Sequence, residues 1–125
     1  KMVDSPTGFR KNDIWYMTYI VFDGQGYETW LSESDDLLHW KSKGKVLSFT
    51  ENTWDANQKA GYISLVNTEW GGDYSVEKYK DKYWMTYLGG NTKKLRNGIP
   101  IILHYYLRKT KMFVGLKTKL FIKVW

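Results

Sequence analysis

The chain has 125 residues, of which 42% are hydrophobic and 18% aromatic, so it is long enough for one modest domain and too short for two. The absence of cysteine excludes a disulfide framework and a thiolate metal site, and no run approaches the roughly 18 apolar residues of a membrane span. The net charge of +6 is uneven, because residues 1–92 carry 10 Lys or Arg against 13 Asp or Glu, whereas residues 93–125 carry 9 Lys or Arg and no acid. A nucleic-acid-binding function would therefore depend on the C-terminal segment alone.

The first 49 residues have the pattern of a meander of short strands. Pro6 makes residues 1–11 a loop or an edge strand, because proline cannot donate to a β-ladder. Residues 23–26 predict a hairpin turn with two permissive glycines. The expected strands around these features are residues 14–22, 27–32 and 46–49. Turns every 8–12 residues are typical of an all-β protein.

A polar corner is expected at residues 34–40, between the second and third of these strands. Its Ser and Asp side chains can satisfy backbone groups of the turn, while Leu37 and Trp40 pack back onto the sheet. We interpret this segment as scaffold and not as a site of chemistry.

Residues 50–92 continue the β pattern after an interruption. Residues 51–58 predict an ordered excursion with one helical turn, and residues 69–73 a glycine-rich turn that holds two carboxylates. Three further strands are expected at residues 61–66, 74–79 and 83–88.

An internal repeat links the two halves of this region. Residues 12–20 match residues 80–88 at an offset of 68, and both copies contain Met-Thr-Tyr. An Asp precedes each copy, Asp4 in the first and Asp73 in the second. Four-stranded sheets repeated at this spacing are typical of a β-propeller.

Residues 93–125 have a different composition and form a separate, basic tail. The composition of the tail predicts either a surface for an anionic partner or a set of two to three edge strands. A third hypothesis is a frameshifted translation, since a shift of one nucleotide lets codons for residues 95–102 spell Tyr-Glu-Thr-Gly-x-Pro-Leu-Ser. The sequence starts at Lys1 and shows no signal peptide, so we expect a piece of a longer protein.

Together, the repeat, its preceding Asp residues and the corner resemble the five-bladed β-propeller glycoside hydrolases of families 43, 32 and 130. A blade of those proteins has an Asp before an aromatic inner strand, then a Ser-x-Asp-Leu-x-x-Trp corner and a Gly-x-Val-Leu strand. Residues 34–40 and 44–47 match this corner and strand. The resemblance covers residues 1–92 and implies about two blades, each an antiparallel four-stranded sheet, from an all-β ring.

The resemblance also implies catalysis by carboxylates that converge on the propeller axis. Glycosidic cleavage needs one protonated acid and one ionised carboxylate. Asp73 resembles the Asp that orients the acid, Asp4 matches a base or a substrate-binding carboxylate, and Glu69 is a candidate acid because it lies near Asp73. The family's Asp-Pro dipeptide is not intact at either Asp. The alternative for Asp73 is a turn carboxylate that accepts backbone hydrogen bonds.

Aromatic residues of the excursion and the following segment are candidates for a sugar-binding rim. Trp54, Tyr62 and Trp70 could offer ring faces to a sugar, with core packing as the alternative. Three other tryptophans, Trp15, Trp30 and Trp84, are assigned to the core. The two histidines, His39 and His104, lack a partner pattern, so no metal site is expected.

The sequence therefore predicts a fragment of a glycoside hydrolase that acts on a plant- or host-derived oligosaccharide, without a cofactor and inactive by itself. A carbohydrate is the expected partner, with no nucleic acid or membrane partner, and a secreted or periplasmic location would suit the full-length parent. The alternatives are a non-catalytic carbohydrate-binding propeller and a family-130-like glycoside phosphorylase, which would need basic residues around a phosphate.

Overall fold

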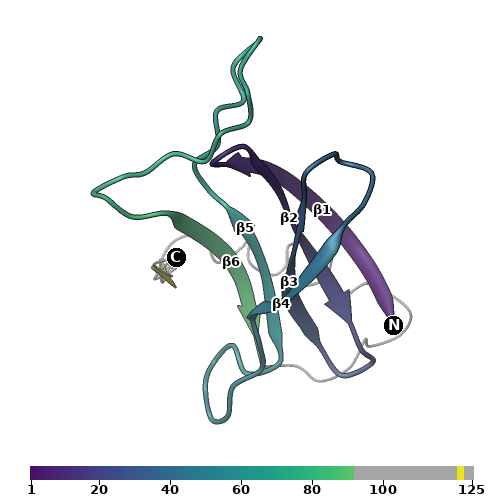
Figure 1. Ribbon diagram of the computed structural model, residues 1–125. Helices are drawn as coiled ribbons and strands as arrows, with labels where there is room; N and C mark the ends of the chain where they lie inside the picture. Colours follow the sequence, from purple (N-terminus) through teal and green to yellow (C-terminus); the bar gives the residue numbers. More distant parts are fainter. Residues whose placement is uncertain (92–120, 123–125) are drawn as a thin grey trace.

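The computed structural model describes residues 1–91 and 121–122 and shows one continuous β-sheet (Figure 1). Its strands are β1 (Met2–Lys11), β2 (Ile14–Phe22), β3 (Tyr27–Ser34), β4 (Lys41–Leu47), β5 (Gln58–Ile63), β6 (Trp84–Gly90) and β7 (Phe121–Ile122). The described residues form no helix, and so none that could cross a membrane. The all-β prediction is confirmed, and the sheet is consistent with part of a propeller-like fold. The predicted tail lies outside the described residues, except for β7.

Strands β1 to β4 form the predicted antiparallel meander. β1 is an edge strand, and the β2–β3 hairpin closes at the pair Phe22 and Tyr27. In the hairpin turn, the Asp23 carboxylate accepts hydrogen bonds from the N–H groups of Gln25 (2.9 Å) and Gly26 (3.2 Å). Gly24 has a φ of 99°, a conformation that glycine adopts without steric cost. β4 begins at Lys41, five residues earlier than the predicted strand at residues 46–49.

Strands β5 and β6 form an antiparallel pair that continues the sheet. The pair joins the meander where Tyr27 of β3 lies parallel to Gln58. β5 begins and ends three residues earlier than predicted. The strand predicted at residues 74–79 is wrong as a continuous strand, since only isolated bridges form there. The helical turn predicted within residues 51–58 is not formed either, because residues 51–57 are bends and turns and residue 58 begins β5.

The core lies where the meander packs against β5 and β6. Alternation along β2 and β3 directs one set of side chains inward, where residues of β1 and β5 pack against them. The buried residues form two clusters, one of Ile20, Phe22, Tyr27 and Ala60 and the other of Phe9, Leu31 and Ile63. Burial of each large apolar side chain stabilises the fold by about 1.5–3 kcal/mol. The tryptophans assigned to the core, Trp15, Trp30 and Trp84, are only half-buried.

The backbone repeats where the sequence repeats. Asn12 and Asp13 have φ angles of 50° and 64°, and their counterparts Lys80 and Asp81 have 52° and 58°. Two consecutive positive φ angles are characteristic of a type I′ hairpin turn. The first turn joins β1 to β2, and the second is closed by reciprocal backbone hydrogen bonds between Tyr79 and Lys82.

The corner at residues 34–40 is polar, as expected. The Ser34 hydroxyl accepts a hydrogen bond from the Leu37 N–H (2.9 Å), and Asp36 accepts bonds from two further N–H groups and contacts the His39 ring (2.7 Å). Trp40 is half-buried and its indole N–H donates to the Leu37 carbonyl. Leu37 does not pack onto the sheet, because its side chain is 48% exposed on a backbone with a φ of 64°.

Candidate functional site

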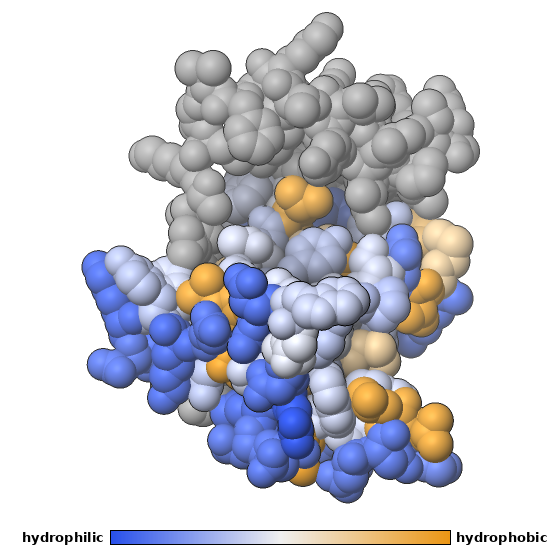
Figure 2. Space-filling view, turned by 90° about the horizontal axis from the view of Figure 1, so that it is seen from above, coloured by the Kyte–Doolittle hydropathy of each residue, from blue (hydrophilic) through white to orange (hydrophobic). Residues whose placement is uncertain are grey.

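An open cleft lies at the end of β1, where the β1–β2 turn meets residues 73–83. Its volume is about 270 Å³, and it is lined by Arg10, Lys11, Asn12, Asp13, Asp73, Ser75, Val76 and Tyr83. We call it the Asp73 cleft. The same end of the molecule presents a mainly hydrophilic surface, with small separate groups of hydrophobic side chains (Figure 2). Such a surface suits a polar ligand.

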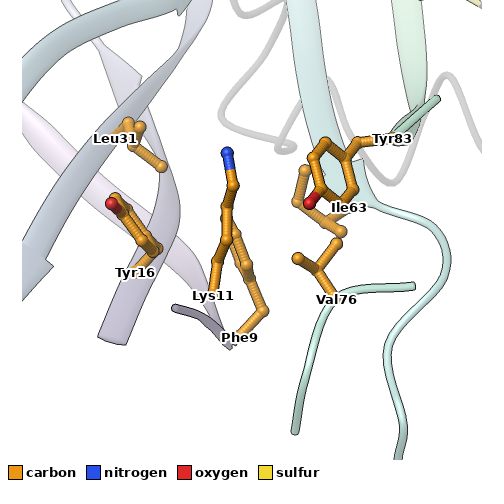
Figure 3. A pocket seen from close by; sticks show the side chains of 7 residues that line it. All are labelled: Phe9, Lys11, Tyr16, Leu31, Ile63, Val76 and Tyr83. Carbon is orange, nitrogen blue, oxygen red and sulfur yellow. The ribbon is translucent and has the colours of Figure 1, made fainter. Parts of the chain in front are cut away.

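A smaller apolar pocket of about 40 Å³ adjoins the Asp73 cleft. The two share Lys11, Val76 and Tyr83, and the pocket is also lined by Phe9, Tyr16, Leu31 and Ile63. Figure 3 shows Lys11 extending between the side chains from β1 to β3 and those of Ile63, Val76 and Tyr83. The polar cleft therefore continues into an apolar recess.

Backbone hydrogen bonds fix the two sides of the cleft to each other. The Arg10 N–H donates to the Tyr74 carbonyl (2.7 Å), and the Val76 N–H donates to the Arg10 carbonyl (2.8 Å). Arg10 and Ser75 thus form an isolated parallel bridge. Residues more than 60 positions apart in sequence are held together by these contacts.

Asp73 is fixed within the cleft by its own turn. Its carboxylate accepts a hydrogen bond from the Ser75 N–H at 2.9 Å, and the intervening Tyr74 has a φ of 58°. Hydrogen bonds from the Ser75 hydroxyl and N–H, together with the charge of Arg10, hold the pKa of Asp73 below its ordinary value. Asp73 is therefore ionised at neutral pH and can serve as a base, an orienting group or a binding carboxylate.

Arg10 connects the two carboxylates of the cleft. Its guanidinium lies 3.0 Å from the Asp13 carboxylate and over the Trp15 ring, with 5.8 Å between the guanidinium carbon and the ring centre. The ring face attracts the cation. Its charge also acts on Asp73.

Several cleft residues were not identified from the sequence. The sequence pattern places Arg10 and Lys11 only at the end of an edge strand, and Asp13 in a turn. The repeat could have indicated Asp13, because its two turns place charged residues at the ends of hairpins. The bridge between Arg10 and Ser75 had no signal of this kind.

Of the three carboxylates predicted to be catalytic, Asp73 alone lines the cleft. Asp4 is on β1 and pairs with Ile20 of β2. It lies six residues before Arg10, and six residues of extended strand span about 20 Å. Glu69 is exposed in the turn that closes the arm at residues 64–77, where its carbonyl accepts the Gly72 N–H (2.8 Å). The structure does not bring these three carboxylates together.

The three predicted sugar-binding aromatics are also separated. Trp70 is fully exposed at the tip of the arm, which projects from one end of the sheet (Figure 1). Trp54 is 42% exposed in the loop before β5, at the opposite end, and stacks on Tyr87 with 6.1 Å between ring centres. Tyr62 is half-buried and packs against the Ile20 cluster, as the core-packing alternative expected.

A second polar network lies near Trp54, away from the cleft. The Asp55 carboxylate is buried, accepts a 2.6 Å hydrogen bond from the Tyr87 hydroxyl and lies 3.7 Å from the Lys59 ammonium. Burial favours a raised pKa at Asp55, but hydrogen bonds from Tyr87 and Thr53 and the charge of Lys59 lower it overall. Burial, followed by the interaction with Asp55, raises the pKa of Tyr87 well above its ordinary value. This network fastens the loop before β5 to β6.

No cluster of three or more potential metal ligands occurs among residues 1–91. The groups that give the cleft its chemistry are carboxylates, cations and one tyrosine ring. They can bind or orient a polar ligand.

Comparisons with known proteins relate the chain to carbohydrate enzymes. No protein-family model and no curated protein sequence matches it. A solved structure titled "Glycoside hydrolase" is 45% identical over 77% of this chain and 29% of that chain, with a TM-score of 0.71. A structure described as a complex of BT0996 and RGII is 47% identical over 78% of this chain and 30% of that chain, with a TM-score of 0.70. The chain spans less than a third of the length of these structures. Their similarity supports the coarse prediction of a glycoside-hydrolase-like chain.

Proposed function

We propose that this chain is part of a glycoside hydrolase. The observation that carries the proposal is its 45% identity, at a TM-score of 0.71, to a structure titled "Glycoside hydrolase". Identity at this level over 77% of the chain is far above the range in which two proteins share only a fold. The proposal assigns the chain to carbohydrate chemistry.

We further propose that residues 1–92 form about two blades of a five-bladed β-propeller. The four-stranded antiparallel meander has the architecture of one blade, and the repeated type I′ turns support a second. The remaining blades would come from a longer protein, because the similar structures are more than three times as long as the matched part. A partial ring is expected to be inactive by itself.

The frameshift hypothesis for residues 93–125 is tested by the nucleotide sequence, where a stop codon in the shifted frame would refute it.

Asp73 is the residue that we propose for catalysis in this segment. Glycoside hydrolysis needs an ionised carboxylate beside a protonated acid, and the lowered pKa of Asp73 supports the ionised role. In this role Asp73 orients the acid or acts as the base. Asp13, held by Arg10 in the same cleft, is an additional candidate for substrate binding. Asp4 and Glu69 remain predictions, and neither gains support from the cleft.

The proposed substrate is an oligosaccharide or polysaccharide. One similar structure is described as an RGII complex, so RGII is the first material to test. A glycoside phosphorylase is the second candidate, because Arg10, Lys11 and Lys78 supply cations at or beside the cleft that could face a phosphate.

The test is a comparison of Asp73→Asn with the unchanged sequence in the longer protein that contains this chain. Release of sugars from RGII and from a panel of polysaccharides is measured by anion-exchange chromatography, and affinity by calorimetry. We expect Asp73→Asn to lower turnover by about 10²–10⁴-fold and to change the affinity by less than about threefold. Asp35→Asn, an exposed carboxylate of the corner, serves as the matched control and should change neither quantity.

Two outcomes would redirect the assignment. Saccharide binding without turnover in either protein would identify a non-catalytic binding propeller. Turnover that requires inorganic phosphate and releases a sugar phosphate would identify a phosphorylase.

A further inference from the structure

Two lysines converge on one tyrosine at the Asp73 cleft. The ammonium groups of Lys11 and Lys78 lie 4.8 Å and 5.2 Å from the centre of the Tyr83 ring. The two ammonium groups are therefore no more than about 10 Å apart. Charges at this separation repel each other, because salt screens only beyond about 8–10 Å. The ring face attracts each cation and offsets part of this repulsion.

Neither lysine has a carboxylate partner within ion-pair distance among residues 1–91. The two carboxylates that line the cleft face Arg10, which pairs with Asp13 and acts on Asp73. The positive charges of Lys11 and Lys78 are thus left without an anion. Both ammonium groups lie over the Tyr83 ring.

Lys11 lies in apolar surroundings, where its unpaired charge is costly. Its side chain is half-buried and extends into the apolar pocket, between Tyr16 and Leu31 on one side and Ile63 and Val76 on the other (Figure 3). A charge among apolar groups is costly unless it is paired. The pocket volume of about 40 Å³ exceeds the roughly 10–15 Å³ that one water molecule requires, so a small group can approach the ammonium.

We propose that Lys11 and Lys78 form an oxyanion subsite, and that its ligand is the carboxylate of an acidic sugar. The inference rests on the proposed function and specifies its substrate class as a saccharide that contains a uronic acid. The carboxylate would accept charge-assisted hydrogen bonds from both ammonium groups, while the Tyr83 ring contacts the sugar face. Asp13 and Asp73 would repel an anion on the Arg10 side, which confines the carboxylate to the lysine side of the cleft.

The test uses calorimetry at fixed, low ionic strength to measure saccharide binding to the full chain. The probes are trigalacturonate, neutral galactotriose and inorganic phosphate. We expect trigalacturonate to bind at least tenfold more tightly than galactotriose. Lys11→Met and Lys78→Met should each weaken trigalacturonate binding by about tenfold, the size expected for one charge-assisted hydrogen bond, and leave galactotriose binding unchanged.

Two further variants separate charge from packing. Lys11→Arg retains the charge and should recover most of the affinity lost in Lys11→Met. Lys41→Met, on exposed β4 and outside the cleft, is the control for removal of a lysine and should bind trigalacturonate as the unchanged chain does. Circular dichroism confirms that each variant folds. If Lys11→Met does not fold, Lys78→Met, which changes an exposed side chain, provides the same test.

The outcomes distinguish this subsite from the proposed function. Equal binding of the acidic and neutral trisaccharides, unaffected by both lysine variants, overturns the subsite and leaves the carbohydrate function in place. Binding of inorganic phosphate that depends on Lys11 and Lys78, without binding of trigalacturonate, replaces the carboxylate with phosphate. Absence of trigalacturonate binding overturns the subsite, whereas the proposed function is decided separately by the turnover measurement on Asp73→Asn in the longer protein.

Discussion

Asp4 and Asp73, which precede the two copies of the repeat, resemble each other in local backbone conformation. The next residue has a positive φ in both copies, 51° at Ser5 and 58° at Tyr74. Each carboxylate also accepts a backbone N–H, from Ser5 at 2.6 Å and from Ser75 at 2.9 Å. A sparsely populated backbone conformation held in place by its own Asp is thus repeated at an offset of 69. Asp73 lines the cleft, whereas Asp4 does not.

The second repeated turn should become more stable when Asp81 is replaced by glycine. Asp81 has a φ of 58° at the position of a type I′ turn where glycine is preferred. We expect Asp81→Gly to raise the free energy of unfolding by about 0.5–1 kcal/mol, since the steric cost of the left-handed backbone exceeds the entropy cost of glycine. Urea unfolding measures the change. Asp35→Gly, at a position without a positive φ, should be neutral or destabilising, and the same result for both variants would contradict the turn geometry.

The buried contact between Asp55 and Tyr87 should make stability depend on alkaline pH. The folded-state pKa of Tyr87 is raised, so its protonated form contributes stability below about pH 10, and this contribution is lost as the pH rises further. We expect Tyr87→Phe to cost about 1–3 kcal/mol at pH 7, because buried Asp55 loses a hydrogen-bond donor.

Urea unfolding at pH 7 and pH 10.5 provides the measurement. The difference between Tyr87→Phe and the unchanged chain should be smaller at pH 10.5 than at pH 7. Tyr79→Phe is the control, since Tyr79 is 56% exposed. A Tyr87→Phe penalty that does not change with pH would show that the hydroxyl proton is not held by Asp55.

The approach of Trp54 to Gly89 should make that glycine sensitive to any side chain. A Cβ atom at Gly89 would lie 2.6 Å from two ring atoms of Trp54 and 2.8 Å from the Asp55 Cβ. We expect Gly89→Ala to lower the free energy of unfolding by about 1–3 kcal/mol, because the indole must leave its packed position. Urea unfolding followed by tryptophan fluorescence reports both effects. Gly8→Ala is the matched control, since the nearest atom to its Cβ would be 3.9 Å away.

The exposed indole at the tip of the arm should affect binding and not folding. Trp70 is fully exposed, so Trp70→Ala should change the free energy of unfolding by no more than about 0.5 kcal/mol. If Trp70 is part of a sugar-binding rim, saccharide affinity should fall several-fold in calorimetry. Leu38→Ala, which removes another exposed apolar side chain, is the control. Unchanged affinity in Trp70→Ala would exclude a role for Trp70 in the rim.

The parts of the fold that depend on local chemistry were predictable from the sequence. The β2–β3 hairpin is specified by Asp23 and Gly24 in its turn and by alternation on either side, and the corner by the hydrogen bonds of Ser34 and Asp36 to nearby N–H groups. The segment predicted as a strand at residues 74–79 was less predictable. Its residues Ser75 and Val76 form isolated bridges with Arg10 and Val66. These tertiary contacts override the alternating pattern of the segment.

The candidate site was predicted only in part, because its geometry is set by long-range contacts. Asp73 was identified through the repeat. Arg10 and Lys11 were not, since nothing near them in sequence indicates that β1 ends beside residues 73–83. The aromatic candidates show the same limit. Tyr62 and Trp70 were both predicted to form a sugar-binding rim, but one packs against the core and the other is exposed to solvent.

The cleft lies where the two copies of the repeat and the residues before them meet. Asn12 and Asp13 belong to the first copy and Tyr83 to the second, and the other lining residues precede one copy or the other. A single copy would have no such cleft, because residues beside both copies line it. The two turns have also acquired different surroundings, because Asn12 and Asp13 line the cleft while Lys80 and Asp81 do not. Substitutions in one copy can therefore reshape the cleft while the other copy retains the shared hairpin framework.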